Sequence, residues 1–156
     1  MFLQRLTDFF QTLGKNKDEF DQDDPRVAAV ALLFYIAYAD GVEQSVEKET
    51  LKNIVSREYE ICGEDLKKLI DAGRNAHQSC LDPLEFASIL KRHLTPQQCT
   101  AFIGLLWEIA YADGYVYELE DTLIWRVADL IGVNRDDRLE LKKQIEEKYK
   151  RSQNNE

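Results

Sequence analysis

The sequence is short of the two residues that most often interrupt regular structure, since its 156 residues include only seven glycines and three prolines. A β-rich domain of this size needs many tight turns, and tight turns draw heavily on glycine and proline. Their scarcity therefore favours long helices. The chain has the length of about one domain and can bury a hydrophobic core without disulfides or a structural metal.

Cysteine is also scarce. Cys62, Cys80 and Cys99 are odd in number and far apart, and no C-x-x-C motif occurs. Neither a disulfide framework nor a cysteine-based zinc ribbon is expected from this pattern. His77 and Cys80 have the spacing of one half of a zinc site, but no second ligand pair lies close by in the sequence. We therefore expect reduced thiols in a cytoplasmic protein.

Long apolar runs and positive charge are both lacking. No stretch reaches the ~20 apolar residues of a membrane-spanning helix, and no secretory signal peptide is recognisable. The 29 acidic residues outnumber the 20 basic ones, and the net charge of −9 argues against nucleic acid as a partner. The sequence also lacks a nucleophile elbow, an H-E-x-x-H motif, a P-loop and a Gly-rich dinucleotide turn, so we expect no enzymatic activity.

What the sequence does contain is an internal repeat. Residues 36–41, Ile-Ala-Tyr-Ala-Asp-Gly, recur letter for letter at residues 109–114, an offset of 113 − 40 = 73. The same offset pairs apolar residues without a gap, from Leu32 with Leu105 to the pair at 55 and 128. A match that keeps both the turn and the helical spacing is typical of a duplicated unit. It predicts a pseudo-two-fold pair of helix-loop-helix units within a single domain.

Helix start signals support an all-α fold of seven to eight helices. Each proline directly follows a side chain that can cap a helix, namely Asp24, Asp82 or Thr95. Two of the predicted helices, over 27–39 and 96–112, are apolar almost all round and should be central. The apolar periodicity predicts helices over approximately 1–13, 25–39, 46–59, 64–77, 83–93, 96–112, 119–131 and 134–150.

We divide the chain into residues 1–24, an amphipathic helix with an acidic hinge, residues 25–150, the helical domain, and residues 151–156, a frayed tail. The first helix has an apolar stripe that suits docking on the core or on a protein partner. The same stripe suits a peripheral contact with a membrane. Its contact residues would be Phe2, Leu6, Phe9 and Phe10.

The candidate site lies in the repeated turns, where each aspartate is followed seven residues later by a glutamate: Asp40 by Glu47, and Asp113 by Glu120. Aspartate in the last turn of a helix faces the negative end of the helix dipole, at a cost of ~0.3–1 kcal/mol. Two compensating arrangements remain open. The carboxylates either cap the following helices, or they bind a divalent cation of unspecified identity.

The cation hypothesis rests on spacing. The glycine and glutamate of each turn are separated like the sixth and twelfth positions of an EF-hand loop. The first and third positions are not oxygen ligands in either copy, because they are isoleucine and tyrosine. Neither turn should therefore hold a cation alone, whereas two neighbouring turns would share one or two cations among four carboxylates.

The doubled Ala-Asp-Gly followed by a glutamate resembles the TerB-like family of tellurite resistance proteins over most of residues 27–133. The resemblance implies an all-helical, bacterial, non-catalytic protein of the stress response. It also implies divalent-metal binding at Asp40, Glu47, Asp113 and Glu120. A related domain occurs in a membrane-anchored DnaJ-type co-chaperone. The alternative function is accordingly a metal-independent scaffold that binds a protein or a membrane through the first helix.

One position departs from the family pattern. The family prefers an aliphatic residue three places after the aspartate; Val116 fits this preference and Glu43 does not. The second turn is therefore the better candidate for a metal. The resemblance leaves the metal, the partner and the oligomeric state unspecified.

Overall fold

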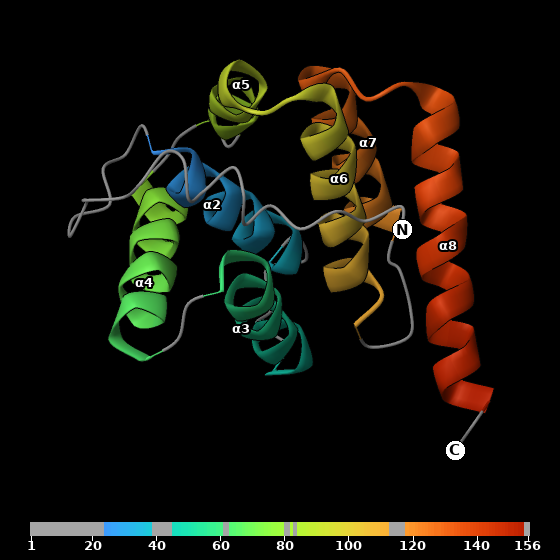
Figure 1. Cartoon of the computed structure of the whole chain (residues 1–156), viewed down its shortest axis with the longest axis horizontal. Coiled ribbons are helices and arrows are strands. Elements are labelled where there is room, and N and C mark those ends of the chain that lie inside the picture. The colour runs from blue at the N-terminus through green and yellow to red at the C-terminus, as the bar shows by residue number, and fades with distance from the viewer. Residues whose placement is uncertain are drawn as a thin grey trace.

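A computed structural model describes residues 24–38, 45–60, 63–79, 82, 84–112 and 118–154 (Figure 1). Within these ranges the chain forms seven α-helices and no strand, which confirms the predicted all-α class. The predicted helix over 1–13 lies outside the described residues. The helices are α2 (Pro25–Ala37), α3 (Ser45–Tyr59), α4 (Gly63–Ser79), α5 (Leu84–His93), α6 (Pro96–Ala110), α7 (Glu118–Ile131) and α8 (Arg135–Asn154).

The predicted caps start three of these helices; at α5, the Asp82 carboxylate accepts the Leu84 backbone N–H at 3.0 Å. The Asp24 carboxylate accepts the Arg26 backbone N–H at 2.8 Å, and Pro25 occupies the first helical position of α2. At α6, the Thr95 hydroxyl accepts the Gln98 N–H at 3.2 Å, and the Gln98 side chain accepts the Thr95 N–H at 2.9 Å. This reciprocal pair is a capping box, which satisfies two donors that helical bonding leaves unpaired.

The two apolar helices, α2 and α6, lie in the core, as predicted, and contact each other. The most extensive packing of α2 is nevertheless with α4 and α5. Its close approach to α4 occurs at Gly73, where an added Cβ would lie 2.3 Å from Val30 Cγ1 and 3.3 Å from the Ala31 backbone nitrogen. Only glycine lets the two helices approach so closely.

Equivalent positions of the repeat have equivalent burial. Both members are buried in the pairs 32 and 105, 33 and 106, 34 and 107, 51 and 124, 54 and 127, and 55 and 128. This agreement is what a duplicated unit would produce. The two-fold relation between the units stays a prediction.

The corner between α7 and α8 is closed at Gly132, which has φ +83°. The Gly132 N–H donates to the Asp129 carbonyl at 3.3 Å, and the Val133 N–H to the Ala128 carbonyl at 3.0 Å. These are the two bonds of a Schellman motif, whose positive φ favours glycine. From this corner α8 runs back along α6 (Figure 1). It ends at Asn154, a few residues beyond the predicted end near residue 150.

Two side chains are more exposed than the apolar pattern of their helices would indicate. Leu130 is 38% exposed, because it lies at the edge of the buried stripe of α7 rather than in its middle. His93 shares the face of α5 that carries the buried Ile89 and Leu90. Its Nδ1 lies 2.9 Å from the Ile89 carbonyl, but the side chain is exposed at the C-terminal end of α5.

Candidate functional site

The structure describes only some of the four predicted acidic residues. Asp40 and Asp113 lie outside them. Glu47 belongs to the first turn of α3, where only its backbone is described. Glu120 is described in full, in the first turn of α7. The sharing of a cation between the two turns therefore stays a prediction.

The helices on either side of the two turns match in register. Helix α2 ends at Ala37 and α6 at Ala110, and 37 + 73 = 110. Helix α3 begins at Ser45 and α7 at Glu118, and 45 + 73 = 118. Each acidic turn is therefore held between helix ends at equivalent positions, as expected if both turns have the same task.

The ends of α2 and α6 also share their local geometry. The Tyr38 N–H donates to the carbonyls of Phe34 and Ile36, and the Tyr111 N–H donates to those of Trp107 and Ile109. The backbone angles are similar, with φ −107° and ψ 18° at Tyr38 and φ −88° and ψ 2° at Tyr111. The backbone therefore leaves α2 and α6 in the same way, two residues before each aspartate.

Glu120 is the predicted ligand whose side chain the structure places. It is 2% exposed, whereas Leu119 beside it is 49% exposed and Glu118 is also exposed. A carboxylate in the first turn of a helix is favoured by the positive end of the helix dipole. Burial of a carboxylate is costly unless hydrogen bonds, a positive charge or a metal compensate it. Glu120 is thus directed into the protein, toward the helices against which α7 packs.

Helix α8 brings charges to the second turn that sequence reasoning missed. Lys142 Nζ lies 2.8 Å from Asp121 Oδ1 and 5.2 Å from the centre of the Trp107 ring. The lysine therefore connects the start of α7 with the end of α6. No local pattern in the sequence marks it, because residues 121 and 142 meet only once α8 folds back.

Glu146, one turn further along α8, meets the end of α6. Tyr111 donates its hydroxyl to Glu146 Oε2 at 3.4 Å. Burial, together with the negative charges of Glu146 and Asp121, raises the pKa of the Tyr111 phenol to about 12. The hydrogen bond from Lys150, whose Nζ lies 2.9 Å from Glu146 Oε1, lowers the pKa of Glu146. The phenol is therefore neutral and the carboxylate charged at neutral pH.

An ion pair between an exposed arginine and a buried glutamate joins two of the helices that flank the turns. Arg57 of α3 places Nη2 at 3.2 Å from Oε2 of Glu108 in α6, and Nε at 3.8 Å from Glu58 Oε2. Both glutamates are 4% exposed. Glu108 could have been found from the sequence, since it is the one acidic residue within the apolar run of α6. Glu58 stands in a polar helix and carries no such signal.

The C-terminal end of α2, in the first unit, packs against a histidine ring rather than charged side chains of α8. The His77 ring of α4 lies 6.3 Å from that of Phe34, 6.5 Å from Tyr35 and 6.1 Å from Tyr38, between ring centres. Burial lowers the pKa of His77. Cys80, its possible zinc co-ligand, lies outside the described residues, and those residues contain no group of three His, Cys, Asp or Glu side chains suited to a metal.

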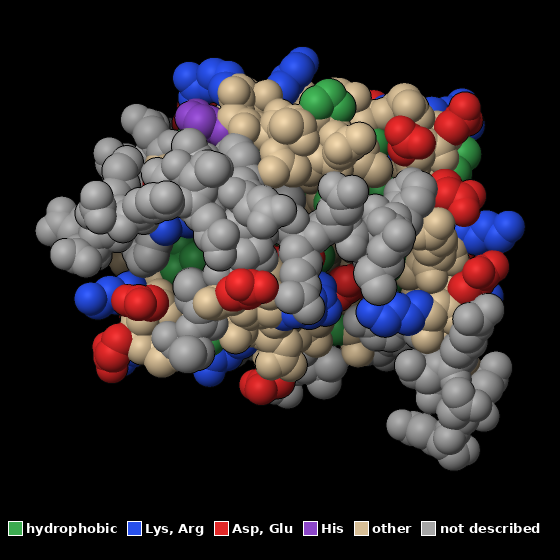
Figure 2. Space-filling model, in the orientation of Figure 1, with side chains coloured by type: hydrophobic (Ala, Val, Ile, Leu, Met, Phe, Trp, Pro, Cys, Tyr) green, Lys and Arg blue, Asp and Glu red, His purple; other side chains and the backbone are tan. Residues whose placement is uncertain are grey.

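The described surface carries both signs of charge, and Figure 2 shows acidic and basic side chains interspersed on one face. No described helix is both long enough and apolar enough to cross a membrane. Phe2, Leu6, Phe9 and Phe10, the predicted membrane or partner contacts, lie outside the described residues. Cys99 is a buried free thiol, and its burial raises the pKa of that thiol.

A comparison with protein families matches residues 26–143 to the family described as tellurite resistance protein TerB. The matched segment runs from the first turn of α2 into α8 and contains all four predicted acidic residues. Comparisons with curated proteins and with solved structures gave no match.

Proposed function

The chain belongs to the TerB family of tellurite resistance proteins, and from this premise we propose that it is a non-catalytic, cytoplasmic stress-response module that binds a divalent cation. The proposed ligands are Asp40 and Glu47 of the first turn with Asp113 and Glu120 of the second. Water would complete the coordination shell, because the two turns offer fewer oxygens than an EF-hand does.

The burial of Glu120 is the observation that supports this proposal most directly. A solvating acidic residue would be exposed like its neighbour Glu118, but Glu120 is 2% exposed. The matching helix ends on both sides of the turns support it further, because they give Glu47 the same place in α3 that Glu120 has in α7.

The donor set indicates which cations to expect. All four side chains are carboxylates, and carboxylate oxygens suit Ca²⁺, Mg²⁺ and Mn²⁺. Zn²⁺ sites more often include histidine or cysteine. Only the second turn also has the aliphatic residue, Val116, that the family pattern prefers, so Asp113 and Glu120 should contribute more to affinity than Asp40 and Glu47.

Calorimetric titration of the full chain, after treatment with a chelator, tests the proposal. We expect heat of binding with at least one of Ca²⁺, Mg²⁺ and Mn²⁺, and stabilisation by about 2.7 kcal/mol at a free cation concentration of 100 times Kd. Asp113→Asn and Glu120→Gln should each weaken binding at least tenfold, by roughly the amount that loss of a supporting ligand costs. Glu118→Gln is the matched control, since it removes an exposed carboxylate from the same helical turn.

A variant of the first turn tests whether both turns bind the same cation. If both turns hold it, Asp40→Asn also weakens binding; if the second turn acts alone, Asp40→Asn leaves Kd unchanged. Absence of heat and of any melting shift with all the cations would refute metal binding. The carboxylates would then serve as helix caps, and the family membership would stand.

A further inference from the structure

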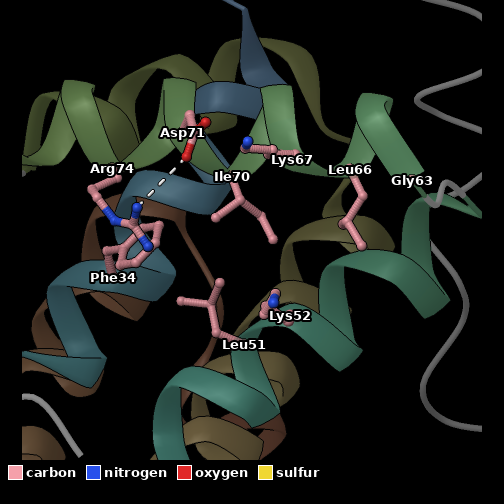
Figure 3. Close-up of a pocket in the computed structure, with 9 residues that line it drawn as sticks. All are labelled: Phe34, Leu51, Lys52, Gly63, Leu66, Lys67, Ile70, Asp71 and Arg74. Atoms are coloured by element: carbon pink, nitrogen blue, oxygen red, sulfur yellow. Dashed lines mark ion pairs between the residues drawn. The ribbon is translucent and has the colours of Figure 1, made fainter. Parts of the chain in front are cut away.

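A pocket of about 360 Å³ opens between α2, α3 and α4 (Figure 3). Its volume is near the lower end of the ~300–1,000 Å³ typical of small-molecule sites. Glu120, the proposed cation ligand whose side chain is described, is not among the described residues that line it. An explanation of this pocket therefore goes beyond the proposed function.

The floor of the pocket is aliphatic. Leu51 of α3 and Ile70 of α4 are 1% and 5% exposed, and with the half-buried Leu66 they are directed into the same space (Figure 3). Phe34 of α2 closes one side, but the Arg74 guanidinium lies over its ring, 5.4 Å from the centre. The surface left for a ligand is therefore mostly leucine and isoleucine, which favours a flexible alkyl chain over an aromatic ring.

The rim of the pocket is positive, although the chain carries a net charge of −9. Lys52 comes from α3 and Lys67 from α4, so the two lysines face the opening from different helices. Arg74 already has a partner, because its Nη1 lies 3.5 Å from Asp71 Oδ1. Among the described residues, no carboxylate forms an ion pair with either lysine, and both lysine side chains are exposed.

An aliphatic floor below a cationic rim is complementary to a small amphipathic anion. We propose that the pocket binds a free medium-chain fatty acid, with its alkyl chain on Leu51, Leu66 and Ile70 and its carboxylate between Lys52 and Lys67. A simple anion such as phosphate would find no polar floor to bind. A neutral alkyl molecule would gain nothing from the lysines.

Decanoate, used below its micelle concentration, is the probe. Titration of the isotope-labelled full chain should shift the backbone amide NMR signals of Leu51, Leu66 and Ile70 in a saturable one-to-one process. Decanol, which lacks the charge, and acetate, which lacks the chain, should each bind at least tenfold more weakly, the order expected when two rim charges or the whole apolar contact is lost.

Charge reversal tests the rim. The double variant Lys52→Glu/Lys67→Glu should bind decanoate at least tenfold more weakly, since two favourable charge contacts become repulsive. The matched control is Lys91→Glu/Lys143→Glu, which makes the same change at two exposed lysines outside the pocket and should leave Kd unchanged.

Four outcomes would overturn the proposal. Decanol could bind as tightly as decanoate, or the Lys52→Glu/Lys67→Glu variant could bind decanoate unchanged. The NMR shifts could be confined to residues outside the pocket, or acetate could bind as tightly as decanoate, which would indicate a simple anion site. None of these results depends on the cation titration, so the two proposals fail separately.

Discussion

The close approach of α2 and α4 yields the most quantitative prediction. In Gly73→Ala, the new Cβ would lie 2.3 Å from Val30 Cγ1 and 2.6 Å from Val30 Cβ. Carbon atoms in favourable contact are ~3.5–4.0 Å apart, so the helices must separate. Val30 is fully buried and β-branched, and its side chain has little freedom to move away.

Two opposing effects determine how much Gly73→Ala changes the free energy of unfolding. Alanine is a better helix former than glycine by up to about 1 kcal/mol. Overpacking of a core typically costs about 1–3 kcal/mol, and both short contacts here put the cost near the upper end. The net effect should be destabilisation by about 2 kcal/mol, which for a domain of this size lowers Tm by about 4–8 °C. Urea denaturation followed by circular dichroism measures the free energy directly.

A double-mutant cycle tests whether the stability lost in Gly73→Ala comes from the contact with Val30. Val30→Ala alone should cost about 2 kcal/mol, because it removes two buried carbons. It also removes the nearer of the two clashing atoms, so the double variant should be more stable than the sum of the single changes by at least about 0.5 kcal/mol. Asn75→Ala, at an exposed position of α4, should stay within about 0.5 kcal/mol of the wild type. A neutral or stabilising Gly73→Ala, or strict additivity with Val30→Ala, would refute the close approach.

Two further predictions concern the second unit. The pKa of Tyr111 is raised to about 12 from its ordinary value of 10.0. The folded state therefore disfavours loss of the phenol proton, and the neutral phenol contributes stability at pH values below 10. That contribution is lost as the pH rises to about 12. Glu146→Gln should lower that pKa, as measured by ultraviolet titration against a Tyr111→Phe reference; an unchanged pKa would show that Glu146 has no influence. Gly132→Ala should cost about 1–2 kcal/mol in urea denaturation, because φ is +83° with open space around the Cβ position. Gly132→Asn should cost less, and equal costs would contradict the conformational explanation.

The local features of the fold were predictable from the residues. The caps at Asp24 and Thr95 and the turn at Gly132 depend on side chains within a few positions of the helix ends, so the sequence contains all the groups involved. The burial of α2 and α6 followed from their sequences too, because both helices are apolar almost all round. Leu130 shows the limit, because a residue at the edge of a stripe is buried or exposed according to what packs beside it.

The candidate cation site was likewise predictable only in its local features. The repeat identified the turns, and the matching ends of α2, α6, α3 and α7 have the register that the 73-residue offset requires. The burial of Glu120 came from tertiary structure. So did the pairing of Arg57 with Glu108, two residues that lie 51 positions apart and contribute to each other's environment only when α3 packs on α6.

By itself the sequence determined the helical class, the helix ends and the duplicated acidic turns, because hydrogen bonds and side-chain contacts within one or two turns decide these features. The tertiary structure alone decided the lysine-rimmed pocket. Lys52 and Lys67 share an opening because Gly73 lets α4 lie against α2 beside α3, and the distance and angle between packed helices depend on side-chain shapes that no single helix contains.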